Sequence, residues 1–261
     1  MQRPEIWDLV APGYAERAAY FLPYVEEALR VAALAPPARL LDVATGPGTL
    51  ALFAAARAAS VTAVDFSPGM IAALRDRAAR DGVTNLDARV MDAQALALPD
   101  ASFDAAFCLF GFMFFPDRGR AFRELLRVLR PGGCAVVATW APIERRPFMK
   151  IGFDALAEAL PDLPPPPKGD LQEVAHCVRE MSQAGFSGVV AHPFSASMRV
   201  QSAEQYVQLM ERTAAPFAAM RKKLGEKEWP AVAERILGAV QRRLPGPADL
   251  SAEAIMTRGT R

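Results

Sequence analysis

The most constraining feature of the sequence is a glycine-rich turn after an apolar run, followed by a second apolar run that ends in an acid. The turn lies in LLDVATGPGT at residues 40–49, and the acid is Asp65, at the end of VTAVD at residues 61–65. This order is typical of an open parallel sheet that binds a nucleoside beyond its strand ends. Gly46 and Gly48 lack a Cβ, so the backbone can bend sharply and a ligand can lie against it.

Asp65 is expected at the tip of the second strand. There its carboxylate can accept hydrogen bonds from both hydroxyl groups of a ribose. The third position of a dinucleotide fingerprint is occupied by Ala51, a substitution that the fingerprint tolerates. A nicotinamide-dependent oxidoreductase therefore stays open as an alternative, as does a cofactor-binding scaffold without transfer activity.

Predicted strands and helices alternate through the first half of the chain. The strand patterns continue at residues 89–93, 102–108 and 134–140, and the helical patterns fall at residues 50–59, 68–80 and 118–129. Ser67 is a suitable N-cap for the second helix, with Pro68 at its first position. Alternation of this kind predicts an α/β fold, a parallel sheet with helices on both faces and a ligand crevice beyond the carboxyl ends of the strands.

Four ordered segments carry a family resemblance. LLDVATGPGT, VTAVDFSPGM, VMDAQALALPDASFD and FRELLRVLRPGG resemble, in order and spacing, the class I S-adenosylmethionine-dependent methyltransferases, especially the branch related to ubiquinone and menaquinone C-methyltransferases. The resemblance is close over residues 38–140 and loose in the flanks. It implies a Rossmann-like, seven-stranded and mostly parallel sheet with an antiparallel last strand beside the fifth. It also implies S-adenosylmethionine as cofactor and S-adenosylhomocysteine as product.

The expected cofactor contacts follow from the chemistry of this molecule. Asp42 would hold the turn, Asp65 would bind the ribose, and Asp92 would accept from the adenine amine. Phe66 and Met70 offer apolar surface, although Met70 could instead pack in the core. The N-terminal segment, with Tyr14 and Trp7, would fold over the cofactor, or these two rings would only pack together. The full set of expected cofactor residues is Tyr14, Asp42, Ala44, Gly46, Gly48, Asp65, Phe66, Met70, Asp92, Ala93 and Cys108.

An aromatic run at residues 109–117 follows the fourth strand, where loops ordinarily carry specificity. It predicts a small, apolar or aromatic acceptor. The expected pocket residues are Phe110, Phe112 and Met113, whereas Phe114 and Phe115 are expected to pack under the next helix.

Methyl transfer from a sulfonium is an in-line displacement, so alignment and exclusion of water can supply most of the catalysis. The chain has only His176 and His192 as histidine bases, and both lie in segments where a structural role is expected. No catalytic residue is assigned.

We expect a single domain over residues 1–261. Its parts are an N-terminal helical cap at 1–37, a sheet core at 38–200, a helical insertion at 201–246 and a closing strand at 250–261. The insertion is expected to form a lid or wall of the substrate pocket and a homodimer contact. Residues 161–167, which are rich in proline, predict a surface loop or a hinge.

Charge, hydrophobicity and cysteine spacing argue against several other classes of protein. The formal charge of +1 gives no basic face for nucleic acid, and no apolar run approaches the ~20 residues needed to span a membrane. Acidic residues near the N-terminus argue against a secretory signal, so a cytoplasmic protein is expected. The three cysteines, Cys108, Cys134 and Cys177, have no metal-ligand spacing, so we expect no metal.

Overall fold

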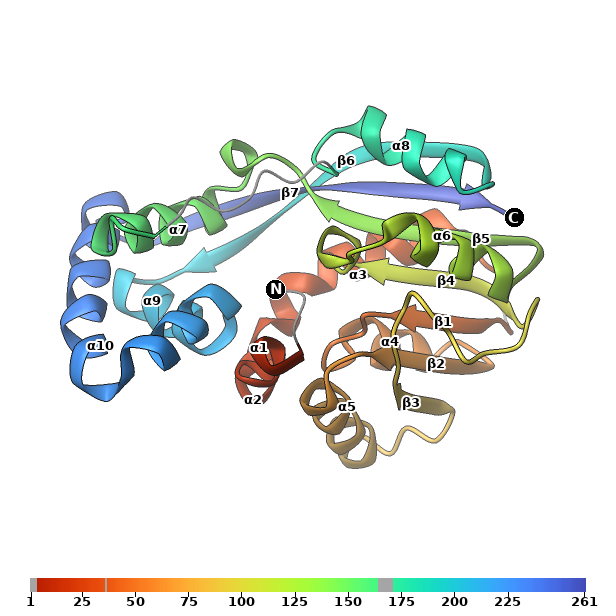
Figure 1. Cartoon of the computed structure of the whole chain (residues 1–261), viewed down its shortest axis with the longest axis horizontal. Helices are drawn as coiled ribbons and strands as arrows, with labels where there is room; N and C mark the ends of the chain where they lie inside the picture. Colours follow the sequence, from red (N-terminus) through yellow and green to blue (C-terminus); the bar gives the residue numbers. More distant parts are fainter. Residues whose placement is uncertain (1–3, 36, 164–170) are drawn as a thin grey trace.

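The computed structural model describes residues 4–35, 37–163 and 171–261. A seven-stranded sheet in the order β3-β2-β1-β4-β5-β7-β6 runs through this part of the chain (Figure 1). The strands are β1 Arg39–Val43, β2 Ser60–Asp65, β3 Leu86–Val90, β4 Phe103–Leu109, β5 Leu129–Trp140, β6 Ser187–Val200 and β7 Ala248–Thr260. The strands β1 to β5 pair in parallel, and β7 runs antiparallel to both β5 and β6. The predicted fold, with an antiparallel last strand beside the fifth, is confirmed.

Helices cover both faces of the sheet and create two hydrophobic cores. The helices α3 Ala18–Ala32, α4 Thr49–Ala55 and α5 Pro68–Arg80 contribute to the first core, and α6 Arg118–Val128 and α8 Val174–Gln183 contribute to the second. Successive residues of a strand point alternately into the two cores. In β1, for example, Leu40 belongs to the first core and Leu41 to the second. A parallel strand buried on both faces reads as a continuous apolar run, which explains the pattern of β1.

Short helices precede α3 and form an N-terminal cap. They are α1 Pro4–Asp8, α2 Ala11–Tyr14 and the 3₁₀ turn η1 Ala15–Arg17. Val10 and Ala11 pack on Met70 at the start of α5, so the cap lies over the carboxyl ends of β1 and β2.

The second half of the chain forms a long extension. The helices α7 Pro147–Ala159, α9 Ala203–Thr213 and α10 Ala215–Arg243 gather around the far end of the β6–β7 pair (Figure 1). The short turns η2 Phe112–Phe114 and η3 Ile143–Arg145 follow β4 and β5. The helical insertion predicted at residues 201–246 contains α9 and α10, and α10 has a break at Gly225, whose φ is 69°.

Some boundaries differ from the sequence expectation. The third strand covers residues 86–90 rather than 89–93, so Asp92 and Ala93 lie in the loop after it. Within the predicted loop at residues 161–167, residues 164–167 lie outside the described residues. In the part of the chain that is described, no helix is both long enough and apolar enough to cross a membrane.

Candidate functional site

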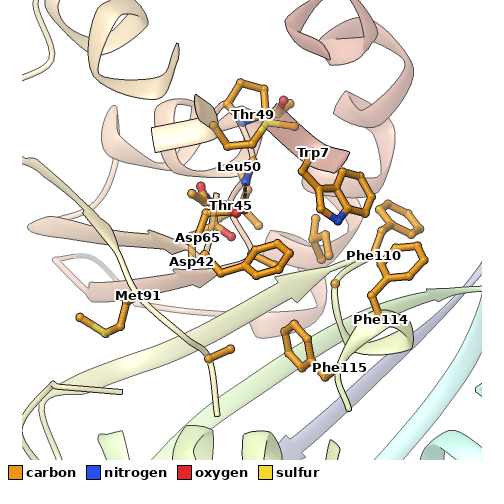
Figure 2. Close-up of a pocket in the computed structure, with 18 of the residues that line it drawn as sticks. Trp7, Asp42, Thr45, Thr49, Leu50, Asp65, Met91, Phe110, Phe114 and Phe115 are labelled. Carbon is orange, nitrogen blue, oxygen red and sulfur yellow. Dashed lines mark hydrogen bonds between the residues drawn. The ribbon is translucent and has the colours of Figure 1, made fainter. Parts of the chain in front are cut away.

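A cavity of about 400 Å³ opens where the carboxyl ends of β1, β2 and β4 meet the N-terminal cap. Figure 2 shows the carboxylates Asp42 and Asp65 on one side of it and the rings of Trp7 and Phe114 on another. The cavity is lined by Trp7, Tyr14, Phe21, Val25, Asp42, Ala44, Thr45, Gly46, Pro47, Thr49, Leu50, Asp65, Phe66, Met70, Met91, Asp92, Ala93, Gln94, Leu109, Phe110, Gly111, Phe114, Phe115 and Pro116. Its volume and its mixture of apolar walls with a few polar groups are typical of a small-molecule site.

The turn after β1 is held by Asp42. Its Oδ2 accepts a hydrogen bond from the Thr45 hydroxyl at 2.6 Å, and the side chain is buried. Burial raises the pKa of Asp42 to about 7, against the lowering effect of the Thr45 hydrogen bond. Ala44 has a positive φ of 54°, a strained conformation for a residue with a side chain, and such strain gathers at ligand sites.

The two glycines of this turn have different roles. Gly46 has a φ of +55°, and a Cβ added there would meet no atom within 4 Å, so its backbone faces open space in the cavity. Gly48 has a φ of +82°, and a Cβ there would lie 2.1 Å from Cδ1 of Leu74. Gly48 therefore permits close packing of the turn against α5 and does not line the cavity, contrary to its expected cofactor contact.

Asp65 lies at the end of β2, as its sequence position predicts. Its Oδ2 accepts from the Gly46 amide at 2.9 Å, and its Oδ1 accepts from the Ser67 amide at 2.9 Å. Burial raises the pKa of this carboxyl to about 6, against the lowering effect of these amides. An ionised carboxylate offers about four acceptor sites, so lone pairs remain for hydroxyl donors from a ligand.

Asp8 joins the N-terminal cap to the site, a role that the sequence analysis missed. Its Oδ1 accepts from the Ser67 hydroxyl at 2.5 Å and from the Gly69 amide at 2.9 Å. The Ser67 hydroxyl in turn accepts from the Met70 amide, which confirms Ser67 as the N-cap of α5. One carboxylate from α1 therefore ties the cap to the helix that follows Asp65.

The other expected cofactor residues occupy three parts of the cavity wall. Asp92, Ala93 and Gln94 form the wall after β3, where Asp92 Oδ1 accepts from the Gln94 amide at 2.9 Å. Phe66 lines the wall beside Asp65. Met70 both lines the cavity and packs under the cap, so its two anticipated roles coincide. Tyr14 and Trp7 line the cavity from the cap, with ring centroids 6.3 Å apart.

The structure exchanges the expected places of Phe112 and Met113 with those of Phe114 and Phe115. Phe110 lines the cavity, but Phe112 is buried in the second core against Phe122, with ring centroids 4.1 Å apart. Met113 packs on the first core, whereas Phe114 and Phe115 line the cavity. The cause is the 3₁₀ turn η2, which has about three residues per turn and sends neighbouring side chains in different directions.

Two further expectations are corrected. Cys108 is fully buried beneath Gly111, where a Cβ would lie 2.8 Å from its Sγ, and so it does not reach the cavity. The described lining residues include none from α9 or α10, which instead contact the cap from outside. The predicted insertion therefore supports the cap and is not itself a wall of this cavity.

The two histidines lie elsewhere in the described structure. His192 is on β6, with its Nε2 2.7 Å from Oε1 of Glu27, and His176 is on α8. In the described part of the chain, no group of three or more histidine, cysteine or acidic residues could hold a metal ion.

Comparison with known proteins shows what this chain is similar to. Residues 40–133 match the model of a methyltransferase domain. The chain is 46% identical to the demethylmenaquinone methyltransferase of Thermus thermophilus over 116 residues, which are 43% of this chain and 51% of that protein. It is 37% identical to the ubiquinone/menaquinone biosynthesis C-methyltransferase UbiE of Geobacter sulfurreducens over 117 residues, 43% of this chain and 46% of that one. The chain thus matches about half the length of these relatives.

A solved structure extends the likeness to the whole fold. The YcgJ protein of Bacillus subtilis superposes with a TM-score of 0.60 at 17% sequence identity, over 92% of this chain and 98% of that chain. At this identity the likeness concerns the fold alone. The family match covers β1 to β4 and the start of β5, and the cavity lies at the carboxyl ends of β1, β2 and β4.

Proposed function

We propose, from the premise that this chain belongs to the class I S-adenosylmethionine-dependent methyltransferases in the branch related to ubiquinone and menaquinone C-methyltransferases, that it methylates a small, apolar or aromatic acceptor. One observation carries the proposal. A single cavity joins a desolvated carboxylate beside an open glycine turn to a wall of aromatic rings. The first part suits a nucleoside, and the second suits an apolar reactant.

The residues present fit the cofactor. Asp65 would accept from the ribose hydroxyl groups, because its carboxylate is buried and retains acceptor capacity. The backbone at Ala44 and Gly46 would lie along the amino-acid portion, where the space beside Gly46 is open. Phe66 and Met70 would contact the adenine, and Asp92 and the Ala93 amide would meet its polar edge. Tyr14 would close this compartment from the cap.

When bound, S-adenosylmethionine supplies a methyl group on a sulfonium, which is a good leaving group. The chain then has to hold the acceptor in line and exclude water, and alignment of this kind can contribute roughly 7–11 kcal/mol. The cap tied down by Asp8 covers the strand ends and would exclude water. We assign no general base, because both histidines lie away from the described lining residues.

The aromatic wall indicates the class of acceptor. Phe110, Phe114 and Trp7 present rings to the cavity, and the Trp7 and Phe114 ring centroids lie 5.3 Å apart. Flat apolar surfaces of this kind favour an acceptor with an aromatic ring over a strongly hydrated aliphatic one. The relatives named for demethylmenaquinone and for ubiquinone or menaquinone biosynthesis support a quinol-like ring.

The sheet disfavours the nicotinamide alternative. A dinucleotide-binding Rossmann domain has the order 3-2-1-4-5-6. Here an antiparallel β7 is inserted between β5 and β6. The accessible cavity and the buried Asp65 give no support to a scaffold that has lost its cofactor site.

A methyl-transfer screen tests the proposed function. Purified protein would be incubated with methyl-labelled S-adenosylmethionine and a panel of hydroquinones, naphthols, phenols and alkylamines. We expect label in the aromatic acceptors and none in the alkylamines, because the cavity wall is apolar. Transfer only to the alkylamines would contradict the acceptor class. Calorimetry with NAD in place of S-adenosylmethionine is the control, and tight binding of NAD alone would contradict the cofactor.

Acidification should weaken cofactor binding while stabilising the free protein. Burial raises the pKa of Asp42 to about 7 and of Asp65 to about 6, whereas an unfolded aspartate titrates near about 3.9. Between these values the folded state binds more protons, so the free energy of unfolding contributed by these carboxyls rises as the pH falls. Binding of the ribose hydroxyl groups needs ionised Asp65. The affinity for the cofactor should therefore be about tenfold lower at one pH unit below the pKa of Asp65.

Calorimetric binding of S-adenosylhomocysteine and ligand-free melting temperatures, both measured between about pH 7.5 and about pH 5, check this prediction. The opposite directions of the two effects separate it from general acid unfolding. A parallel fall of affinity and melting temperature would contradict it.

A further inference from the structure

Two arginines are buried next to the cavity without an acidic partner. Arg17 is 4% exposed and Arg146 is 8% exposed. Among the described residues, the Nε of each guanidinium has no hydrogen-bond partner, and neither guanidinium forms an ion pair. Glu144 acts on Arg146 electrostatically but is exposed. Buried charges are normally paired, so two unpaired cations indicate a missing anion.

Arg17 lies directly behind two rings of the cavity wall. Its Cζ is 5.3 Å from the Phe21 ring centroid and 6.0 Å from that of Tyr14, and both rings line the cavity. Its Nη2 lies 3.4 Å from the sulfur of Met149, a weak acceptor. The guanidinium is therefore one ring away from the space where the acceptor is proposed to bind.

Arg146 reaches the same wall from another element. It precedes α7, and its Cζ lies 5.9 Å from the Trp140 ring centroid. Trp140 stacks on Phe110 with ring centroids 3.8 Å apart, and Phe110 lines the cavity. Burial lowers the pKa of Arg146, as expected for a cation without a compensating anion.

Tyr20 completes the cluster with a third buried polar group. Its hydroxyl makes no hydrogen bond of standard geometry among the described residues. It interacts with the neighbouring Tyr24 hydroxyl, which donates to the Ala252 carbonyl oxygen at 2.6 Å, and with the charges of both Arg17 and Arg146. Arg17 Cζ lies 5.2 Å from the Tyr20 ring centroid, and this ring stacks on Phe148 in the first turn of α7 at 4.6 Å. The positive end of the α7 dipole adds to the field of the two arginines.

We propose that Arg17, Arg146 and Tyr20 bind a carboxylate carried by the methyl acceptor, which would enter their cluster when the Phe21 ring turns aside. This inference rests on the proposed function. A carboxylate matches the planar fork of a guanidinium and can also accept from a hydroxyl. Phe21 is only partly buried, and ring rotations of this kind are common when ligands bind. Among the proposed aromatic or apolar acceptors, those that carry a carboxylate would therefore bind most tightly.

Calorimetry with benzoate as probe tests the inference. The protein would be saturated with S-adenosylhomocysteine, then titrated with benzoate and, as the neutral isostere, with benzamide. We expect benzoate to bind at least about tenfold more tightly than benzamide. Arg17→Met and Arg146→Met should each weaken benzoate binding at least about tenfold. Tyr20→Phe, which removes only a hydroxyl, should weaken it by roughly three- to fivefold and serves if an arginine variant fails to fold.

A matched control is Arg57→Met, because Arg57 also lies over a phenylalanine ring, 6.0 Å from the Phe53 centroid, but is exposed. It should leave benzoate affinity unchanged. Benzoate affinity equal in all variants, or absent while S-adenosylhomocysteine binds, would overturn the inference and leave the proposed function standing. Failure to bind S-adenosylhomocysteine at all would count against the proposed function itself.

The cofactor also carries a carboxylate, so the arginines could bind the cofactor and not the acceptor. A comparison of S-adenosylhomocysteine with 5′-methylthioadenosine distinguishes these two cases. 5′-Methylthioadenosine lacks the amino-acid portion of S-adenosylhomocysteine. Under the proposal, Arg17→Met and Arg146→Met leave the affinities for both nucleosides unchanged. Weakened S-adenosylhomocysteine with unchanged 5′-methylthioadenosine would assign the arginines to the cofactor and overturn the proposal.

Discussion

Replacement of Asp65 by alanine is expected to lower the affinity for S-adenosylhomocysteine at least about 100-fold, because two hydrogen bonds to a charged acceptor are lost. Hydrogen bonds of this type contribute about 1.5–3 kcal/mol each. The side chain is buried at the end of β2, where water cannot readily replace it. Isothermal titration calorimetry of the variant and the parent protein measures the effect directly.

Asp104→Ala is a matched control for the loss of a buried strand carboxylate. Asp104 lies near the start of β4, away from the cavity, and accepts from the Arg39 amide at 2.5 Å. Its removal should leave S-adenosylhomocysteine affinity unchanged while lowering stability. If Asp65→Ala and Asp104→Ala bind the ligand as tightly as the parent protein does, the cofactor site has been misplaced.

The second large effect concerns stability. Gly48→Ala is expected to destabilise the fold by about 2–5 kcal/mol, since the new Cβ would overlap Leu74 and the residue would keep a left-handed backbone. The backbone φ is +82°, and the ideal Cβ position lies 2.1 Å from Leu74 Cδ1. Urea unfolding followed by circular dichroism measures the change.

Gly46→Ala gives the contrasting case two residues earlier. Gly46 also has a positive φ, but no atom lies within 4 Å of the position that a Cβ would occupy there. We therefore expect a stability loss of only about 1–2 kcal/mol, from the backbone alone. The added methyl group should instead weaken S-adenosylhomocysteine binding by entering the cavity. Equal stability losses in the two variants would contradict the separate roles of the two glycines.

The local parts of this site could be predicted from the sequence. The α5 helix covers the predicted residues 68–80, and Ser67 caps it, because capping depends on neighbouring residues alone. Asp65 ends β2 as expected, since a buried parallel strand has an unmistakable apolar pattern. Local sequence patterns were therefore enough to predict the position of Asp65 at the end of β2.

The parts that depend on tertiary packing could not be predicted. The directions of Phe112 and Phe114 depend on a 3₁₀ turn that an unbroken aromatic run does not reveal. The hydrogen bonds of Asp8 to Ser67 and Gly69 join segments about 60 residues apart, and no local pattern signals them. Similarly, the sequence shows that Arg17 and Arg146 are cations, but only the fold shows that they are buried and unpaired.

The most direct test of the central claim is a crystal structure of the protein with S-adenosylhomocysteine. We predict that the nucleoside lies across the ends of β1 and β2, with both ribose hydroxyl groups within hydrogen-bonding distance of Asp65 and the amino-acid portion along the backbone at Gly46. A ligand bound outside this cavity, or a cavity filled by the protein's own side chains, would contradict the account.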